Sequence, residues 1–148
     1  ELVQLSAELG SDCPFFCTQG SALIKGRGEI ITPIDFNLKG KYVLLVNPNI
    51  HISTAEAYGG LNLSETTQSN IDWSITENDW QENWINDFEK TLSGKYPTLQ
   101  RIKKTLINTG ANYASLSGSG SSVFGVFHTK PKKNMFTEEG FSEWIFTL

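Results

Sequence analysis

The 148-residue sequence is poor in the residues from which small proteins build metal sites and disulfide frameworks. Its two cysteines, Cys13 and Cys17, stand four positions apart, and no second pair of ligands accompanies them. This spacing does not fit a four-ligand zinc site, and two cysteines do not make a disulfide framework. We therefore expect no metal site, and we expect two buried free thiols in a reducing cytoplasm.

The sequence also lacks an excess of basic charge and a long apolar run. Its 12 Lys and Arg residues against 16 Asp and Glu residues give a formal net charge of -4, which argues against a general nucleic-acid partner. Nothing in it resembles a signal peptide or a membrane span, so we expect no membrane partner. A nucleotide substrate remains possible, because a few local N–H donors suffice for one diphosphate.

The apolar content is sufficient for one core of ordinary size, since 39% of the residues are hydrophobic, with four Trp and nine Phe among them. The order of the predicted elements indicates an α+β fold, a ferredoxin-like split β-α-β sandwich. We also expect extended structure from residue 15 to 17, a polar link over 35–40 and an irregular segment over 59–70. The predicted elements are a helix end at 1–9, strands at 21–25, 29–34 and 42–46, a short helix reaching residue 58, helices at 78–92 and 98–108, two strands within 112–127 and a strand at 141–146.

Two of the predicted helices carry clear apolar stripes. In the helix over 78–92, apolar residues recur at every fourth position and predict one buried face. In the helix over 98–108, three apolar residues point inward, Gly110 ends the helix, and Lys103 and Lys104 are expected in solvent. The stripe residues are Trp80, Trp84, Phe88 and Leu92 in the first helix and Leu99, Ile102 and Leu106 in the second.

The segment over 128–140 stands where the second crossover helix of such a sandwich belongs. It contains Pro131 and a lysine-rich turn, and it is too short for a good helix. One face of the sheet could therefore be more exposed than usual, or it could pair with another chain.

Serine and glycine alternate in the turn between the two strands predicted within 112–127. Small residues in Ser117–Ser121 let the backbone approach a ligand closely, and the free N–H and hydroxyl groups of such a turn can hold phosphate oxygens. A plain glycine-serine hairpin loop would have the same composition. The pattern alone leaves both interpretations open.

A carboxylate, Asp12, lies in a segment where the chain can turn. It follows a Gly-Ser pair and precedes Cys13, which is expected to be extended because a proline follows it. Next to the apolar Phe15 and Phe16, a carboxylate can be partly desolvated and can act as a general base. A role as a turn or capping carboxylate is the alternative.

These segments together resemble the 4-diphosphocytidyl-2-C-methyl-D-erythritol kinases, a family within the superfamily of galactokinase, homoserine kinase, mevalonate kinase and phosphomevalonate kinase. The resemblance covers about residues 5–128 and implies that residues 1–36 are the tail of a ribosomal-protein-S5-like N-terminal domain. Residues 37–148 would then form the ferredoxin-like C-terminal domain. Four segments carry the resemblance: Leu9–Phe16, like L-G-[AS]-D-x-P-x-F; Gly26–Pro33, like G-x-G-E-x-[IL]-x-P; Leu45–Tyr58, like a strand-Pro-…-[ST]-T-x-x-[FY] segment; and Ser115–Phe127, like an S-G-[ST]-G loop.

The resemblance implies ATP-dependent phosphorylation of the 2-hydroxyl of 4-diphosphocytidyl-2-C-methyl-D-erythritol, a step of isoprenoid precursor synthesis, with Mg²⁺ bound to the nucleotide. Asp12 matches the catalytic aspartate of the family. Thr54 matches a substrate-contacting threonine, and Tyr58 lies where the family places an aromatic ring against the cytosine. The third superfamily motif, which lines the phosphate-bearing region, matches Ser117, Gly118, Ser119 and Gly120.

The lysine motif and the ATP phosphate loop P-x-x-x-G-L-G-S-S of the superfamily do not occur in the sequence. We therefore expect the C-terminal half of such a kinase, with the missing N-terminal half as its partner, and no activity of this chain alone. Two alternatives stay open: another superfamily kinase, of the homoserine or mevalonate type, and a non-catalytic binding module that keeps the fold. Structural roles also stay open for the two proposed substrate-binding residues: Tyr58 could be an aromatic residue at the edge of the core, and Thr54 could be a helix N-cap.

Overall fold

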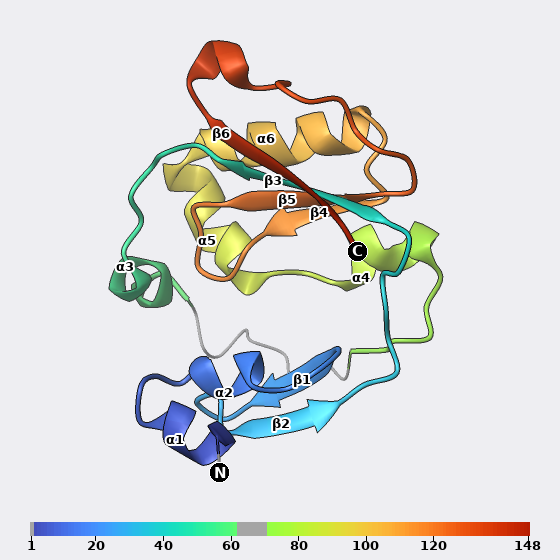
Figure 1. Cartoon of the computed structure of the whole chain (residues 1–148). Helices are drawn as coiled ribbons and strands as arrows, with labels where there is room; N and C mark the ends of the chain where they lie inside the picture. The colour runs from blue at the N-terminus through green and yellow to red at the C-terminus, as the bar shows by residue number, and fades with distance from the viewer. Residues whose placement is uncertain (1, 62–70) are drawn as a thin grey trace. The chain divides into compact units, whose positions relative to one another are not determined.

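The computed structural model describes residues 2–61 and 71–148, and the chain divides into two compact units, Glu1–Lys39 and Gly40–Leu148. In the first unit two short helices precede an antiparallel hairpin, as the sequence predicts for the two strands (Figure 1). Of the segment predicted to be irregular, residues 62–70 lie outside the described residues. The elements of this unit are α1 (Leu2–Ala7), α2 (Cys13–Phe16), β1 (Ala22–Lys25) and β2 (Ile30–Pro33).

Helix α2 stands where extended structure was predicted, so that prediction is wrong for Cys13 as well as for residues 15–16. Pro14 lies in the first turn of this helix, where backbone N–H groups have no intrahelical acceptor. The absence of an N–H on proline therefore costs no helix hydrogen bond, and its fixed φ suits the helix. The prediction of buried thiols is also wrong, because Cys17 is exposed and Cys13 is only half-buried.

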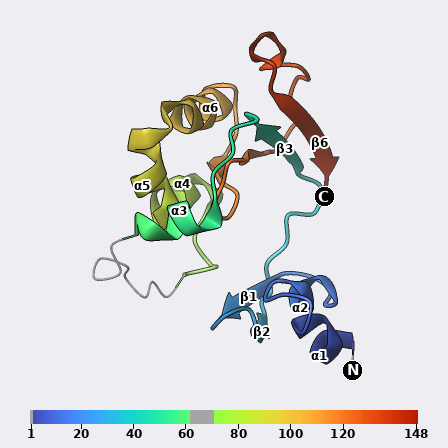
Figure 2. The same ribbon diagram turned by 90° about the vertical axis from the view of Figure 1, so that its left-hand side faces the viewer.

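The second unit is built on a four-stranded antiparallel sheet with the strand order β4-β5-β3-β6 (Figures 1 and 2). The α+β class is confirmed, and β3 is a central strand, as its continuous apolar run predicts. Because β3 and β4 both run antiparallel to β5, they are parallel to each other, with β5 between them in a split β-α-β arrangement. The elements are β3 (Tyr42–Asn47), α3 (Thr54–Gly59), η1 (Glu77–Asp79), α4 (Trp80–Asn83), α5 (Asp87–Lys95), α6 (Pro97–Asn108), β4 (Tyr113–Leu116), β5 (Val123–Phe127), η2 (Thr137–Glu139) and β6 (Ser142–Thr147).

Helix α6 covers one face of this sheet and supplies much of the core. Its residues Leu99, Ile102 and Leu106 are buried, as their spacing predicts. Strand β5 meets the helix at Gly125, where an added Cβ would lie 3.3 Å from the Leu106 Cβ and 3.2 Å from the Ala111 Cβ. A glycine at this position therefore lets the helix approach the sheet closely.

The single helix predicted over 78–92 is wrong, because the chain forms η1, α4 and α5 with a break at residues 84–86. Trp84 has φ -100° and ψ 94°, and its carbonyl accepts a hydrogen bond of 2.9 Å from the Tyr113 hydroxyl. Asn86 then starts a new helix, since its side chain accepts from the Phe88 N–H at 3.0 Å. Tertiary hydrogen bonds thus outweigh the continuous apolar stripe. Helix α5 continues past the predicted end at residue 92 and includes Gly94.

The segment between β5 and β6 contains only the 3₁₀ turn η2 among its described residues, in agreement with the prediction that it is too short for a helix. Phe136 from this segment is buried in the core, and the Glu143 carboxylate accepts from its N–H at 2.7 Å. On β6, Trp144 and Phe146 remain about half exposed. In the described part of the chain, no helix has the length and the apolar character that a membrane crossing requires.

We predict that Gly125→Ala lowers the free energy of unfolding by about 1–3 kcal/mol, because the added methyl overpacks the contact between α6 and β5. Gly94→Ala is the matched control, since it lies in a helix with nothing within 4 Å of an added Cβ. This control should stabilise the protein by about 0.5–1 kcal/mol. Urea unfolding of both variants measures the difference, and equal effects would contradict the close approach.

Candidate functional site

The loop between β4 and β5 has a backbone geometry that requires glycine. Its ends are closed by a hydrogen bond of 2.8 Å from the Ser117 N–H to the Ser122 carbonyl, and the Gly120 N–H donates to the Ser117 carbonyl at 3.0 Å. Gly118 and Gly120 have φ values of 56° and 92°. Side chains other than glycine are strained at such angles, so the alternating glycines have a structural cause.

The same loop offers hydrogen-bond donors. The N–H groups of Gly118 and Ser119 and the hydroxyls of Ser117 and Ser119 make no hydrogen bond to any described residue. Successive free N–H groups in a glycine-containing turn form a concave site for an anion. The donors present therefore fit phosphate oxygens.

Asn86 and Glu89, which the sequence analysis did not single out, hold the start of this loop. The Asn86 side-chain amide donates to the Leu116 carbonyl at 3.0 Å and to the Gly118 carbonyl at 2.8 Å. The Glu89 carboxylate accepts from the Leu116 N–H at 2.8 Å and from the Ser115 hydroxyl at 3.0 Å. The first turn of α5 is thereby fixed to the strand and to the loop.

Lys103 is only partly exposed, whereas the prediction placed it in solvent, and Lys104 is exposed as expected. The Lys103 ammonium lies 2.5 Å from the second oxygen of Glu89, and its side chain is only 27% exposed. Glu89 therefore joins α5, α6 and β4 through one carboxylate.

Thr54 and Tyr58 lie on helix α3. Thr54 is not the N-cap of this helix, and Tyr58 is not part of the buried core. Ser53 is the N-cap, since its hydroxyl accepts from the Glu56 N–H at 3.1 Å, so the N-cap alternative for Thr54 is wrong. Tyr58 is 60% exposed and leans edge-on against Phe88, with ring centroids 5.0 Å apart. Both side chains are accessible to a ligand.

Glu56 fixes α3 against the junction of α5 and α6. Its carboxylate pairs with Lys95 and accepts from the Tyr96 hydroxyl at 2.7 Å, and these bonds hold the pKa of Glu56 below its usual value. The tie thus adds stability at neutral pH and loses it as the pH falls through the lowered pKa. An added Cβ on Gly120 would lie 3.5 Å from Ile52, so the start of α3 and the loop lie at the same end of the sheet (Figures 1 and 2).

In the first unit, Asp12 occupies the N-cap position of α2, but its side chain is exposed and makes no capping hydrogen bond. A capping role for this carboxylate is therefore not observed. The turn between β1 and β2 packs against the backbone next to Asp12, because an added Cβ on Gly28 would lie 1.9 Å from the Ser11 carbonyl oxygen. The Glu29 carboxylate accepts from the Arg27 N–H at 2.6 Å and closes this turn. The Leu9–Phe16 and Gly26–Pro33 segments thus pack together.

Neither a metal cluster nor a histidine-based catalytic group emerges from the part of the chain that the structure describes. No three His, Cys, Asp or Glu side chains gather there in a way that could hold a metal ion. His128 lies 2.7 Å from the Glu77 carboxylate, which also pairs with Lys41 at 2.5 Å. These contacts are structural.

The model of the family described as GHMP kinases C terminal matches residues 69–138. The chain is 45% identical over 129 residues to a 4-diphosphocytidyl-2-C-methyl-D-erythritol kinase of Azobacteroides pseudotrichonymphae, covering 86% of the chain and 48% of the relative. The chain thus spans about half the length of the curated relatives that it matches.

Two solved structures share the fold. A crystal structure of 4-(cytidine 5'-diphospho)-2C-methyl-D-erythritol kinase matches with a TM-score of 0.72 and 22% identity, over 84% of this chain and 47% of that one. Homoserine kinase from Cytophaga hutchinsonii matches with a TM-score of 0.60 and 15% identity, over 86% of this chain and 48% of that one. At these identities the likeness concerns the fold alone.

We predict that Asn86→Ala lowers the free energy of unfolding by about 2–3 kcal/mol, because it removes a helix cap and leaves two carbonyls without their donor. The matched control is Asn83→Ala, whose exposed amide donates only to the Asp79 carbonyl of its own helix, and we expect a change within about 0.5 kcal/mol. Hydrogen exchange of residues 117–122 should accelerate in the first variant only. Unchanged exchange in Asn86→Ala would contradict the role of Asn86 in holding the loop.

Proposed function

We propose that this chain, whose residues 69–138 match the model described as GHMP kinases C terminal, is the C-terminal part of an ATP-dependent kinase that phosphorylates the 2-hydroxyl of 4-diphosphocytidyl-2-C-methyl-D-erythritol. The observation that carries the proposal is the 45% identity, over 86% of the chain, to a relative named for that substrate. The reaction belongs to isoprenoid precursor synthesis. The likeness to homoserine kinase, at 15% identity, concerns the fold and does not favour a homoserine-type substrate.

The loop is proposed to hold phosphate oxygens. Phosphoryl transfer depends on alignment and on neutralising charge at the transferred group. Gly118 and Ser119 would contribute their free N–H groups, and Ser117 and Ser119 their hydroxyls, which need no rearrangement to accept an anion. Gly120, whose N–H closes the turn, would let the backbone adopt the conformation that presents these donors. ATP is the proposed co-substrate, and Mg²⁺ bound with it would supply further neutralisation of the phosphates.

Asp12 is proposed to accept the proton of the substrate hydroxyl. A general base needs a free carboxylate that can reach the reacting group, and Asp12 is exposed with no capping bond to occupy it. We assign residues 1–36 to the tail of a ribosomal-protein-S5-like N-terminal domain and residues 37–148 to a ferredoxin-like C-terminal domain. The remainder of the N-terminal half is the proposed partner that completes the site.

Tyr58 is proposed to stack on the cytosine, with Thr54 contacting the substrate beside it. The Tyr58 ring is 60% exposed while Phe88 supports its edge, which leaves a ring face for a base. Stacking is worth about 1–3 kcal/mol per base. The supporting Phe88 follows Asn86 in the first turn of α5, so one helical turn would serve both the phosphate and the base subsites.

In the full-length protein that contains this chain, Asp12→Asn should lower kcat by at least about 100-fold and leave the KM for ATP nearly unchanged, because only proton transfer is lost. The matched control is Asp35→Asn, an exposed aspartate of the same unit, which should keep its activity. Steady-state transfer of phosphate from ATP to the purified substrate is the measurement. Near-normal turnover of Asp12→Asn would remove the general base from the proposal.

Tyr58→Ala should raise the KM for the cytidine substrate about 5- to 100-fold, with a much smaller change in the KM for ATP, because the stacking surface is lost. Tyr58→Phe retains the ring and should behave like the natural protein. An equal loss of affinity for both substrates in Tyr58→Ala would contradict base stacking.

A further inference from the structure

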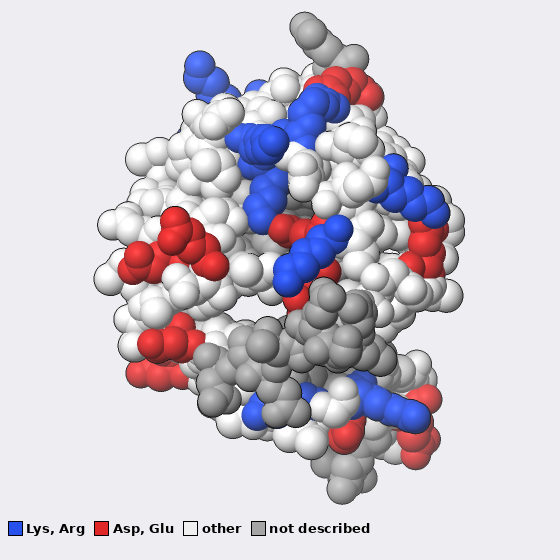
Figure 3. Space-filling view, turned by 180° about the vertical axis from the view of Figure 1, so that it is seen from behind, with Lys and Arg blue, Asp and Glu red and all other residues white. Residues whose placement is uncertain are grey.

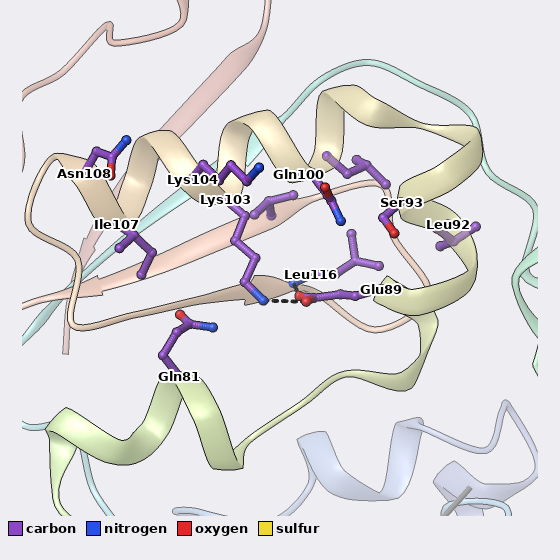
Figure 4. A pocket seen from close by; sticks show the side chains of 12 residues that line it. Gln81, Glu89, Leu92, Ser93, Gln100, Lys103, Lys104, Ile107, Asn108 and Leu116 are labelled. Carbon is purple, nitrogen blue, oxygen red and sulfur yellow. Dashed lines mark hydrogen bonds and ion pairs between the residues drawn. The ribbon is translucent and has the colours of Figure 1, made fainter. Parts of the chain in front are cut away.

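A cavity lies beside the outer edge of β4, apart from the residues assigned to the kinase reaction. It has a volume of about 310 Å³ and is bounded by α4, α5 and α6 (Figure 4). None of the proposed catalytic, substrate-binding or phosphate-loop residues lines it. Its apolar lining comes from Leu92, Leu99, Ile107, Leu116 and Val123.

Gln81, Glu89 and Lys103 form one polar side of the cavity, and Gln100 and Asn108, which also line it, have side-chain amides that make no hydrogen bond to a described residue. The Gln81 side-chain oxygen accepts from the Ala114 N–H at 2.8 Å, which leaves its NH₂ group without a partner among the described residues. The two oxygens of Glu89 are taken by β4 and by Lys103. Lys103 makes this one bond and has two further N–H groups. The spare donors of Gln81 and Lys103 therefore suit a ligand that brings acceptor oxygens to this side of the cavity.

The charge of the lining favours an anion with a single charge. Three charged residues line the cavity, and two of them, Glu89 and Lys103, neutralise each other. Lys104 is the third, and it forms no ion pair with any described residue. Several Lys and Arg side chains gather on the face seen in Figure 3, which carries α5 and α6. The local charge is thus close to +1.

We propose that this cavity binds a small monocarboxylate with an apolar body. The apolar body would lie against the aliphatic lining, and the carboxylate would accept from the spare donors of Lys103 and Gln81, while Lys104 supplies the unbalanced positive charge of the lining (Figure 4). The volume is at the lower end of the range of about 300–1,000 Å³ for ligand sites, which restricts the ligand to one ring or a short branched chain.

The test uses the 148-residue chain with 4-phenylbutyrate and its uncharged counterpart 4-phenylbutanamide as probes. Both have the same size, so a difference between them reports the charge alone. We expect 4-phenylbutyrate to bind with a Kd of about 1 mM or below and at least about threefold more tightly than the amide. In isotope-filtered spectra the ring protons should show nuclear Overhauser effects to methyl groups of Leu99, Ile107 and Val123.

Lys104→Met is the variant of choice, because Lys104 is exposed and its removal leaves the Glu89–Lys103 pair intact. It should reduce the affinity for 4-phenylbutyrate about threefold to tenfold and leave the affinity for the amide unchanged. Lys90→Met, an exposed lysine of α5 that does not line the cavity, is the matched control and should change neither.

Three results would overturn the proposal. The first is no binding of 4-phenylbutyrate up to about 10 mM, which is weaker than an apolar cavity of this size should allow. The second is equal affinity for acid and amide in the natural chain. The third is contact of the ring with methyl groups outside the cavity, which the spectra of the natural chain reveal without any variant. All three are independent of kinase activity.

Discussion

The outer edge of β4 is the constraint on which the second unit depends. An edge strand leaves the N–H and C=O groups of alternate residues unpaired, and here these belong to Ala114 and Leu116. Gln81, Asn86 and Glu89 satisfy three of these four groups, the Ala114 N–H and the Leu116 N–H and carbonyl, with hydrogen bonds of 2.8–3.0 Å. Asn86 also donates to the adjoining Gly118 carbonyl at 2.8 Å. Side chains from α4 and from the start of α5 thus provide hydrogen bonds to the edge strand that a fifth strand would otherwise provide.

This arrangement places the proposed subsites relative to one another within the unit. Three positions in the first turn of α5 have three different tasks: Asn86 holds the loop, Phe88 supports the Tyr58 ring, and Glu89 holds β4. Asn86 and Glu89 are three positions apart and therefore lie next to each other on the helix surface. The same turn of the helix thus supports all three contacts. The loop and Tyr58 are therefore positioned by the same helical turn.

The sequence predicted what depends on local pattern and missed what depends on tertiary hydrogen bonds. The strands of the sheet and the buried stripe of α6 follow from apolar spacing, and the structure has them. The break at 84–86 could not follow from spacing, because it serves acceptors on β4, a strand nearly thirty residues away. The Asn-Asp pair at 86–87 was the available signal, since Asn is a favoured N-cap. The roles expected for Thr54 and Tyr58 rest on the resemblance alone, because no local pattern distinguishes these residues. For Asp12 the local pattern leaves both a general base and a capping carboxylate open, and the resemblance favours the first.

The edge of β4 also explains why a donor-lined cavity lies beside it. A fifth strand would sit about 4.8 Å from β4 and fill that space, whereas single side chains that reach the strand leave room between them. Gln81 must turn its oxygen toward the Ala114 N–H, so its NH₂ group faces away from the strand. Glu89 accepts from β4 in a partly buried place, and Lys103 beside it balances the charge of the carboxylate. The hydrogen bonds to the strand thus determine which groups of Gln81 and Glu89 face the cavity, so that spare donors lie on the side of the cavity next to β4.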